Sequence, residues 1–201
     1  MVKVVFFDLG NVLVNVNRPA IVAGIAEKFH IPEALVLQPA VLEIEKQFEK
    51  GQLTIEEHLA VVKRLYKFDG EISIADLEQI WQIPFELNPE IWQIVQKLKQ
   101  QVSLFLLSNT NELHIRAIRQ KYDILDNLDG LILSYKVGAL KPEPKIYEYA
   151  LRKAGVAAGQ ALFVDDLPEN VAGAERVGIR AHRFTGAAGL QEFLGVYGFK
   201  V

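Results

Sequence analysis

The chain has 201 residues, half of them apolar, a net charge of −3 and no cysteine. This composition supplies a packed core and excludes disulfides, thiolate metal ligands and a cysteine nucleophile. The scattered lysines and arginines do not form the basic face that nucleic-acid binding needs, and no apolar run approaches the roughly 20 residues of a membrane helix. No signal-type segment opens the chain, so we expect a cytoplasmic, globular monomer or homodimer without nucleic-acid or membrane partners.

The first predicted element is a strand at residues 2–7, which ends at Asp8. The run is continuously apolar, which is typical of a strand that is buried on both faces of a parallel sheet. A lone carboxylate that follows a buried strand and precedes a tight turn is a candidate nucleophile.

Helical patterns come next, from about residue 18 to residue 87, and this interval holds no convincing strand. Apolar residues repeat with helical spacing over residues 21–29 and 41–48. A capping box at residues 54–57 opens a third helix, and Ser73 precedes a fourth.

Strands and helices alternate through the rest of the chain. Four further apolar runs predict strands at residues 102–107, 131–133, 161–164 and 179–184. Helices are predicted at residues 91–98 and 113–122, from Pro144 to near Gly155, and at residues 171–177 before Gly178. All five strand runs are continuous rather than alternating, so we expect each strand to be buried on both faces.

This alternation predicts an α/β fold with a Rossmann-like parallel sheet and helices on both faces. Residues 1–16 and 88–201 would form this core domain. Residues 17–87 would form a small all-helical cap domain, inserted after strand one and lying above the carboxyl ends of the strands.

Polar residues follow four of the five predicted strands. They are Asp8, then Ser108 and Asn109, then Lys141 a short loop beyond the third strand, then Asp165 and Asp166. Each alone has an ordinary explanation as a turn, cap or solvated loop residue. The carboxyl ends of parallel strands meet at one edge of the sheet, however, so together these residues predict a single site.

The residue types suit phosphate chemistry. A carboxylate such as Asp8 can attack phosphorus and form an acyl phosphate that water then cleaves. Because that approach is repulsive, a hard cation is needed, and Mg²⁺ could be held by Asp8 and Asp166 with Asp165 close by. The Ser108 hydroxyl can bond phosphate oxygens, and Lys141 offsets the negative charge.

With these motifs the chain resembles the haloacid-dehalogenase superfamily of aspartate-nucleophile hydrolases over essentially its whole length. The Asp-Leu-Gly-Asn-Val segment from Asp8, with Glu49-Lys50-Gly51 in the insert, is similar to the subgroup that contains an α-D-glucose-1-phosphate phosphatase. The resemblance implies a Mg²⁺-dependent phosphatase that acts on a small phosphorylated metabolite. It implies Asp8 as nucleophile and metal ligand, Gly10 as a backbone carbonyl ligand, Ser108 and Asn109 as phosphate binders, Lys141 as the charge clamp, Asp166 as a metal ligand and Asp165 as an alternate or supporting ligand. Asn170 stands where many members carry another acid.

Gly10 departs from the pattern of this superfamily. Most of its phosphatases have an acid at this position, which protonates the leaving alcohol and then activates water. Three alternatives follow: a phosphatase that uses water or a cap residue instead, a 2-haloacid dehalogenase that uses Asp8 without metal, or a non-catalytic protein that binds a phosphorylated ligand or a partner. The acids Asp165 and Asp166 beside Lys141 favour the phosphatase.

The missing acid also predicts a substrate preference. General acid catalysis contributes about 10²–10⁴-fold, and it matters least when the leaving group is already a stable anion. We therefore expect sugar 1-phosphates, or aryl and acyl phosphates, to be preferred over primary alkyl phosphates. Glu45, Phe48 and Glu49 lie in the predicted cap, but the sequence does not orient them, and the four histidines show no ligand spacing.

Overall fold

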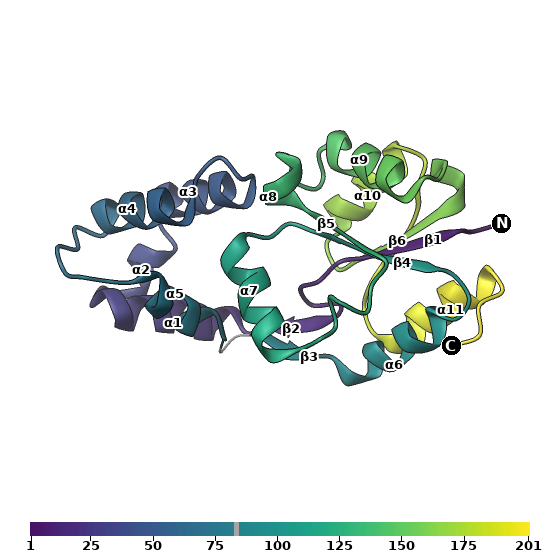
Figure 1. Cartoon of the computed structure of the whole chain (residues 1–201), viewed down its shortest axis with the longest axis horizontal. Helices are drawn as coiled ribbons and strands as arrows, with labels where there is room; N and C mark the ends of the chain where they lie inside the picture. The colour runs from purple at the N-terminus through teal and green to yellow at the C-terminus, as the bar shows by residue number, and fades with distance from the viewer. Residues whose placement is uncertain (83–84) are drawn as a thin grey trace.

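A computed structural model describes residues 1–82 and 85–201. Its centre is a five-stranded parallel sheet with the strand order β5-β4-β1-β6-β7 (Figure 1). The strands are β1 (Val4–Phe7), β4 (Ser103–Ser108), β5 (Gly130–Leu133), β6 (Ala161–Asp165) and β7 (Arg180–Arg183). The sheet predicted from the five apolar runs is confirmed.

Helices cover both faces of this sheet. One layer contains α6 (Pro89–Leu98), α7 (Glu112–Lys121) and α11 (Ala187–Val196); the other contains α8 (Ser134–Val137), α9 (Pro144–Ala154) and α10 (Pro168–Arg176), with a short 3₁₀ turn at Ala158–Gln160. In Figure 1, α9 and α10 lie above the sheet and α6 and α11 lie below it. Successive side chains of β1 serve both cores, because Phe7 packs on the α11 side and Phe6 on the α9 side.

The ends of these helices follow their capping residues. The side chain of Asn88 accepts from the backbone of Ile91 to start α6, and Gly155 ends α9 in the left-handed conformation. The Rossmann-like α/β fold is therefore the observed one.

The outermost strand, β7, differs from the prediction. Arg180 and Arg183 are exposed, and the two residues between them are only half-buried. The prediction that this strand is buried on both faces is wrong, because it lies at an edge of the sheet, where long basic side chains extend into solvent.

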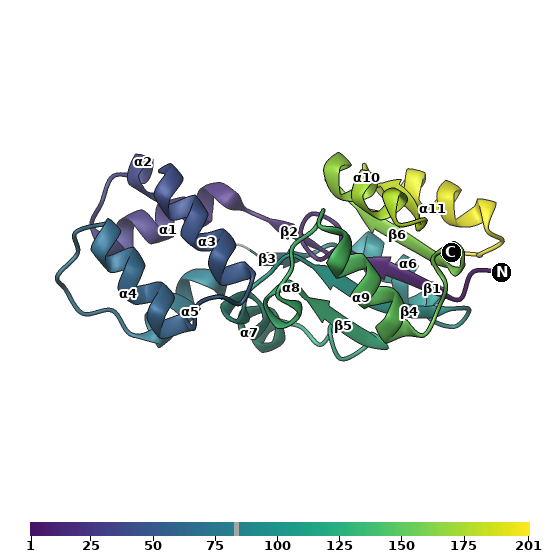
Figure 2. The ribbon, with the colours of Figure 1, turned by 90° about the horizontal axis from the view of Figure 1, so that it is seen from above.

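Five helices between β1 and α6 form a separate layer, which lies beside the sheet in Figure 2. They are α1 (Arg18–Phe29), α2 (Glu33–Val36), α3 (Pro39–Glu49), α4 (Ile55–Leu65) and α5 (Ile74–Gln82). Their apolar faces share a core that includes Phe29, Phe48 and Val62, and Leu113 of α7 joins it. The predicted capping box at Thr54 is present at the start of α4.

A small antiparallel ribbon joins this helical layer to the core. It pairs β2 (Val14–Val16) with β3 (Phe85–Leu87). The prediction that no strand lies between residues 18 and 87 is therefore wrong for β3. Three residues are too few to leave a periodic pattern, and the pairing partner lies about 70 residues away along the chain.

Among the helices of residues 1–82 and 85–201, none combines the length and the apolar character that crossing a membrane requires.

Candidate active site

The predicted polar residues meet at the carboxyl ends of β1 and β6. Lys141 lies between two carboxylates, with its Nζ 2.8 Å from Oδ1 of Asp8 and 2.6 Å from Oδ2 of Asp165. All three residues are buried. Asp8 directly follows the central strand and Asp165 ends its neighbour, so the parallel pairing of β1 with β6 brings the two acids together.

Asp165 is held by further hydrogen bonds. Its Oδ1 accepts from the backbone N–H of Leu167 at 2.9 Å and from Nδ2 of Asn170 at 3.0 Å. Asn170 is itself buried. It stands at a position where the superfamily often carries an acid, and here its amide donates a hydrogen bond to the carboxylate of Asp165. Because both of its oxygens have partners, Asp165 is a rigid support for the lysine.

The neighbouring Asp166 is more open. Its Oδ2 accepts from Nδ2 of Asn11 at 3.0 Å, and Oδ1 of Asn11 accepts from the backbone of Val16 at 3.3 Å. Asn11 has a φ of +56°, a conformation that asparagine adopts more readily than most residues. The sequence pattern predicts no separate role for Asn11, although it lies three residues after the predicted nucleophile.

The three acids suit a hard divalent cation. Ligand oxygens of Asp8, Asp165 and Asp166 all lie within 4.8 Å of one another. When ionised, these three carboxylates carry three negative charges, of which the ammonium of Lys141, paired with Asp8 and Asp165, offsets one, so two remain in a largely buried cluster. Carboxylate oxygens are the ligands that Mg²⁺ prefers, so the donor set fits this ion.

Burial controls the ionisation of the cluster. Burial, opposed by the nearby ammonium of Lys141 and reinforced by Asp165, raises the pKa of Asp8 to about 6. Burial alone would lower the pKa of Lys141, but Asp8 and Asp165 outweigh it and the net pKa is raised. Lys141 therefore stays charged across the neutral range.

The loop after β4 holds the backbone of Lys141 in place. Oδ1 of Asn109 accepts from the backbone N–H of Lys141 at 2.7 Å, and its Nδ2 donates to the Lys141 carbonyl at 2.9 Å. The side chain of Asn109 is thus committed to Lys141. Ser108 is buried, with its Oγ 3.4 Å from the carbonyl of Asn109, and Asn111 caps α7.

The end of α3 docks onto this side of the core. Oγ of Ser134 lies 2.6 Å from the carbonyl oxygen of Glu49, and it also accepts from the backbone N–H of Thr110 at 2.8 Å. Nζ of Lys50 bonds Oε1 of Glu143 at 2.9 Å. Thr110 lies two residues after Ser108, and Glu143 lies two residues after Lys141, so these contacts tie the helical layer to both loops of the site.

Gly51 completes the docking. Its φ is +70°, and a Cβ at this position would lie 2.0 Å from the carbonyl oxygen of Tyr135. Only glycine permits so close an approach of the two backbones. The turn after α3 is consequently fixed against the first turn of α8.

Glu49 is the acid that this docking brings to the site. It is half-buried, and its charge interacts with Asp8 and Lys141 on the core side and with Glu45 and Arg18 on the helical side. Burial, reinforced by Glu45, raises the pKa of Glu49 to about 7. The sequence predicts that Glu49 lies in the insert but does not predict where its side chain points. The Glu49-Lys50-Gly51 segment is the signal in the sequence that singles this residue out.

Two histidines lie near this interface in packed positions. Nε2 of His58 bonds Oε1 of Glu45 at 2.7 Å, and its ring stacks on Phe48 at 4.3 Å. His114 packs its ring edge to face with Trp81 at 4.1 Å. Neither belongs to the three-acid cluster at the strand ends.

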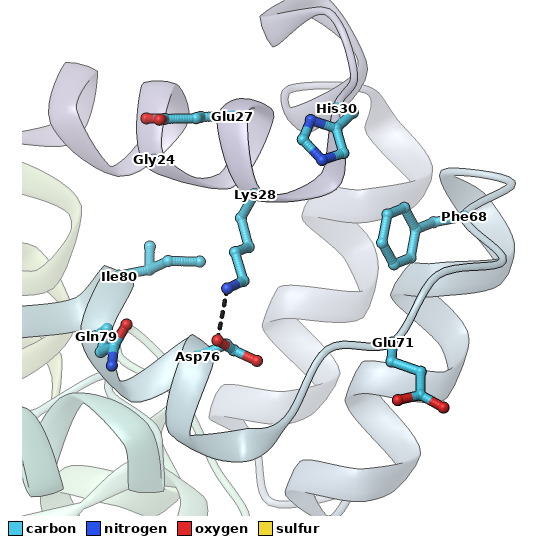
Figure 3. Close-up of a pocket in the computed structure, with 9 residues that line it drawn as sticks. All are labelled: Gly24, Glu27, Lys28, His30, Phe68, Glu71, Asp76, Gln79 and Ile80. Carbon is cyan, nitrogen blue, oxygen red and sulfur yellow. Dashed lines mark hydrogen bonds and ion pairs between the residues drawn. The ribbon is translucent and has the colours of Figure 1, made fainter.

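A pocket of about 460 Å³ lies in the helical layer, away from the strand ends. Figure 3 shows Lys28 of α1 reaching across it to Asp76 of α5, at 2.5 Å. The other lining residues are Gly24, Glu27, His30, Phe68, Glu71, Gln79 and Ile80. None of the predicted site residues lines this pocket. We therefore do not assign the catalytic site to it, despite its volume.

A profile of the haloacid dehalogenase-like hydrolases matches residues 2–178. The chain belongs to this family. It is 27% identical over 190 residues to D-ribitol-5-phosphate phosphatase from Bacteroides thetaiotaomicron, covering 85% of this chain and 86% of that protein. It is 26% identical over 180 residues to the sesquiterpene phosphatase astK from Aspergillus oryzae, covering 88% and 87%.

The fold of this hydrolase is also that of a solved relative. A HAD family enzyme from Bacteroides thetaiotaomicron, crystallised with magnesium and inorganic phosphate, superposes with a TM-score of 0.78 at 23% identity. The match covers 90% of this chain and 93% of that one. The superfamily assigned from the ordered motifs is confirmed, while the glucose-1-phosphatase subgroup stays a prediction.

Proposed function

We propose that this hydrolase is a Mg²⁺-dependent phosphatase that cleaves small phosphorylated metabolites through an aspartyl phosphate on Asp8. The observation that carries the proposal is the cluster of Asp8, Lys141 and Asp165 at the strand ends, with Asp166 beside it. Phosphatase activity in two relatives that cover most of the chain supports it.

Asp8 is the proposed nucleophile. An oxygen of its carboxylate attacks phosphorus, the bond from phosphorus to the organic oxygen breaks, and water then cleaves the acyl phosphate and restores the carboxylate. The ammonium of Lys141 offsets the charge of Asp8 and of the incoming phosphate, and Asp165 with Asn170 holds that ammonium in place.

The phosphate would be bound by groups at the end of β4. Ser108 contributes its hydroxyl. Because the side chain of Asn109 is bonded to Lys141, we assign to Asn109 a contribution from its backbone N–H.

Mg²⁺, when bound, would offset charge on the phosphate oxygens and orient them. Asp8, Asp166 and the backbone carbonyl of Gly10 are its proposed ligands, with Asp165 as the supporting acid. Asn11 orients Asp166 for this role through its 3.0 Å hydrogen bond.

The proposed substrate is a sugar or polyol phosphate, with sugar 1-phosphates favoured by the absence of an acid at Gly10. A hemiacetal oxygen leaves more readily than a simple alcohol, so it depends less on protonation. Residues 17–87 are the proposed cap domain, which would contact the organic half. The relative named for D-ribitol 5-phosphate supports the polyol class, but its named substrate is a primary alkyl phosphate and does not support the preference for sugar 1-phosphates.

The test is a screen of phosphorylated metabolites for phosphate release with and without Mg²⁺, including glucose 1-phosphate and glucose 6-phosphate. Asp8→Asn, which keeps the size of the side chain, should abolish release. Equal kcat/KM for the two glucose phosphates would remove the argument from the leaving group.

The same protein samples test the two alternatives. Chloride release from 2-chloropropionate without metal would identify a dehalogenase, a chemistry in which Gly10 is no handicap because a halide needs no proton. Binding of a phosphorylated ligand without turnover by wild type would identify a non-catalytic protein.

A further inference from the structure

Gly10 leaves the proposed phosphatase without the usual source of a proton, and the end of α3, which is docked against the core beside the site, carries an acid, Glu49. Glu49 ends α3, and its charge interacts with those of Asp8 and Lys141. Glu45, the second acid of α3 that could be considered, is already paired with His58 at 2.7 Å.

Three contacts hold the end of α3 against the core. The Glu49 carbonyl lies 2.6 Å from Oγ of Ser134, Lys50 pairs with Glu143 at 2.9 Å, and the backbone of Gly51 lies against Tyr135. Ser134 is buried and also accepts from the N–H of Thr110, which lies two residues after Ser108. The backbone of Glu49 is thereby fixed relative to the loop that is proposed to bind the phosphate.

The ionisation of Glu49 suits proton transfer in both directions. Burial and the negative charges of Glu45 and Asp8 raise its pKa, while the positive charges of Lys141 and Arg18 lower it, and the balance lies at about 7. A group with such a pKa has both its acid and its base form populated at neutral pH, which is the condition for efficient general acid–base catalysis.

We propose that Glu49 is the general acid and base of this enzyme, in place of the acid that Gly10 lacks. This proposal rests on the phosphatase function proposed above, and it replaces the argument from the leaving group, because with Glu49 as the acid primary alkyl phosphates such as glucose 6-phosphate are turned over as well. As the bond from phosphorus to the organic oxygen breaks, the Glu49 carboxyl gives its proton to that oxygen. A water oxygen then attacks the acyl phosphate, Glu49 takes a proton from the water, and the Asp8 carboxylate leaves.

The decisive variant is Glu49→Gln, assayed with substrates whose leaving groups differ. For glucose 6-phosphate, kcat/KM should fall by about 10²-fold or more, because an alkoxide needs the proton. For p-nitrophenyl phosphate it should fall by less than about tenfold, because nitrophenolate leaves unaided. Glu43→Gln, on an exposed part of the same helix, should change neither value.

A rapid-mixing measurement separates the two half-reactions. Slow hydrolysis of the acyl phosphate in Glu49→Gln should produce a burst of nitrophenolate, equal to the enzyme concentration, that wild type lacks. In wild type, kcat/KM for glucose 6-phosphate should fall as the pH rises through about 7, and Glu49→Gln should lose that decline.

Moving the acid back to its usual position provides a rescue. Gly10 does not have a left-handed φ, and a Cβ there would lie 3.3 Å from Cγ2 of Val16, so a side chain needs only a small shift. In the Glu49→Gln background, Gly10→Asp should restore turnover of glucose 6-phosphate and Gly10→Asn should not.

Several results would overturn the proposal. They are equal losses of kcat/KM on both substrates without a burst, unchanged activity in Glu49→Gln, or equal rescue by Gly10→Asn and Gly10→Asp. In each case wild type would still be a phosphatase. If wild type releases no phosphate from any substrate, the proposed function fails as well.

Discussion

The core side of the site is held by buried ion pairs at strand ends, whereas its helical side is held by one docked helix end. Lys141 makes two short contacts with Asp8 and Asp165, and all three residues are buried. Glu49 is half-buried, and its backbone, rather than its carboxyl, makes the fixing hydrogen bond to Ser134.

The two sides therefore differ in what determines the positions of their side chains. The positions of the core acids follow from strand pairing, so they change only if the sheet changes. The position of Glu49 depends on a few contacts between layers, each worth about 1 kcal/mol, and it can be weakened without unfolding the sheet. We expect variants of the two sides to differ in the same way.

The largest effect should come from Lys141→Met. It leaves the buried acids Asp8 and Asp165 without their cation, which should cost about 3–5 kcal/mol of folding stability and abolish phosphate release. Urea denaturation measures the first and a phosphate assay the second. Lys145→Met, an exposed lysine in the same segment, is the control, and equal stability of the two variants would contradict the buried pair.

The next effect tests the docking of α3. Gly51→Ala combines a positive φ with a Cβ 2.0 Å from the Tyr135 carbonyl, while Gly155→Ala has nearly the same φ and nothing within 4 Å. Gly155→Ala should cost about 1 kcal/mol from its backbone conformation alone.

Gly51→Ala should cost more than that and should also lower kcat/KM, because the turn must move away from α8. Thermal denaturation and the phosphate assay on both variants give the comparison. Equal activity in the two would show that the contact with Tyr135 does not affect the site.

A smaller effect is expected for Ser134→Ala. This change leaves the carbonyl of Glu49 and the N–H of Thr110 without their shared partner, which should cost about 1–3 kcal/mol. Activity should fall while the sheet stays folded, as circular dichroism would report. Ser103→Ala, at an exposed position at the start of β4, is the matched control, and activity equal to that of this control would argue against the link.

The last effect is absent at neutral pH and develops only as the pH falls; it concerns His114 of α7, whose ring packs against Trp81 of α5. Burial, reinforced by His58, lowers the pKa of His114 to about 3 from an ordinary value of 6.5. The unfolded chain therefore binds the proton first as the pH falls below about 6.5, so folding stability declines from there toward pH 3, by at most about 1.4 kcal/mol per pH unit.

His114→Asn should flatten this decline. Urea denaturation at pH 7, 6, 5 and 4 measures the slope, and the exposed His30→Asn is the control. An unchanged slope in His114→Asn would contradict a buried neutral imidazole.

The same contrast explains what the sequence could predict. The five strands and the meeting of Asp8, Lys141 and Asp165 follow from local patterns, because parallel pairing carries strand ends to one edge. The commitment of Asn109 to the Lys141 backbone was not visible, since it depends on how two loops approach each other.

Other features could not be predicted from the sequence for similar reasons. β3 is three residues long and pairs across the whole insert, and α11, for which no element was predicted, contains two glycines that weaken its helical pattern. The orientation of Glu49 depends on the docking of α3, which no periodicity encodes. The core side of the site was therefore predictable, and the helical side was not.

The β2–β3 ribbon has a consequence for how this chain can be altered. Val16 and Phe85 are direct partners across an antiparallel pair, so the two ends of the inserted segment lie about 5 Å apart. A two-residue hairpin turn spans such a pair. The segment between these two residues can therefore differ in length without stretching the sheet, because a connection as short as a turn and one as long as the helical layer meet the ribbon at the same pair of residues.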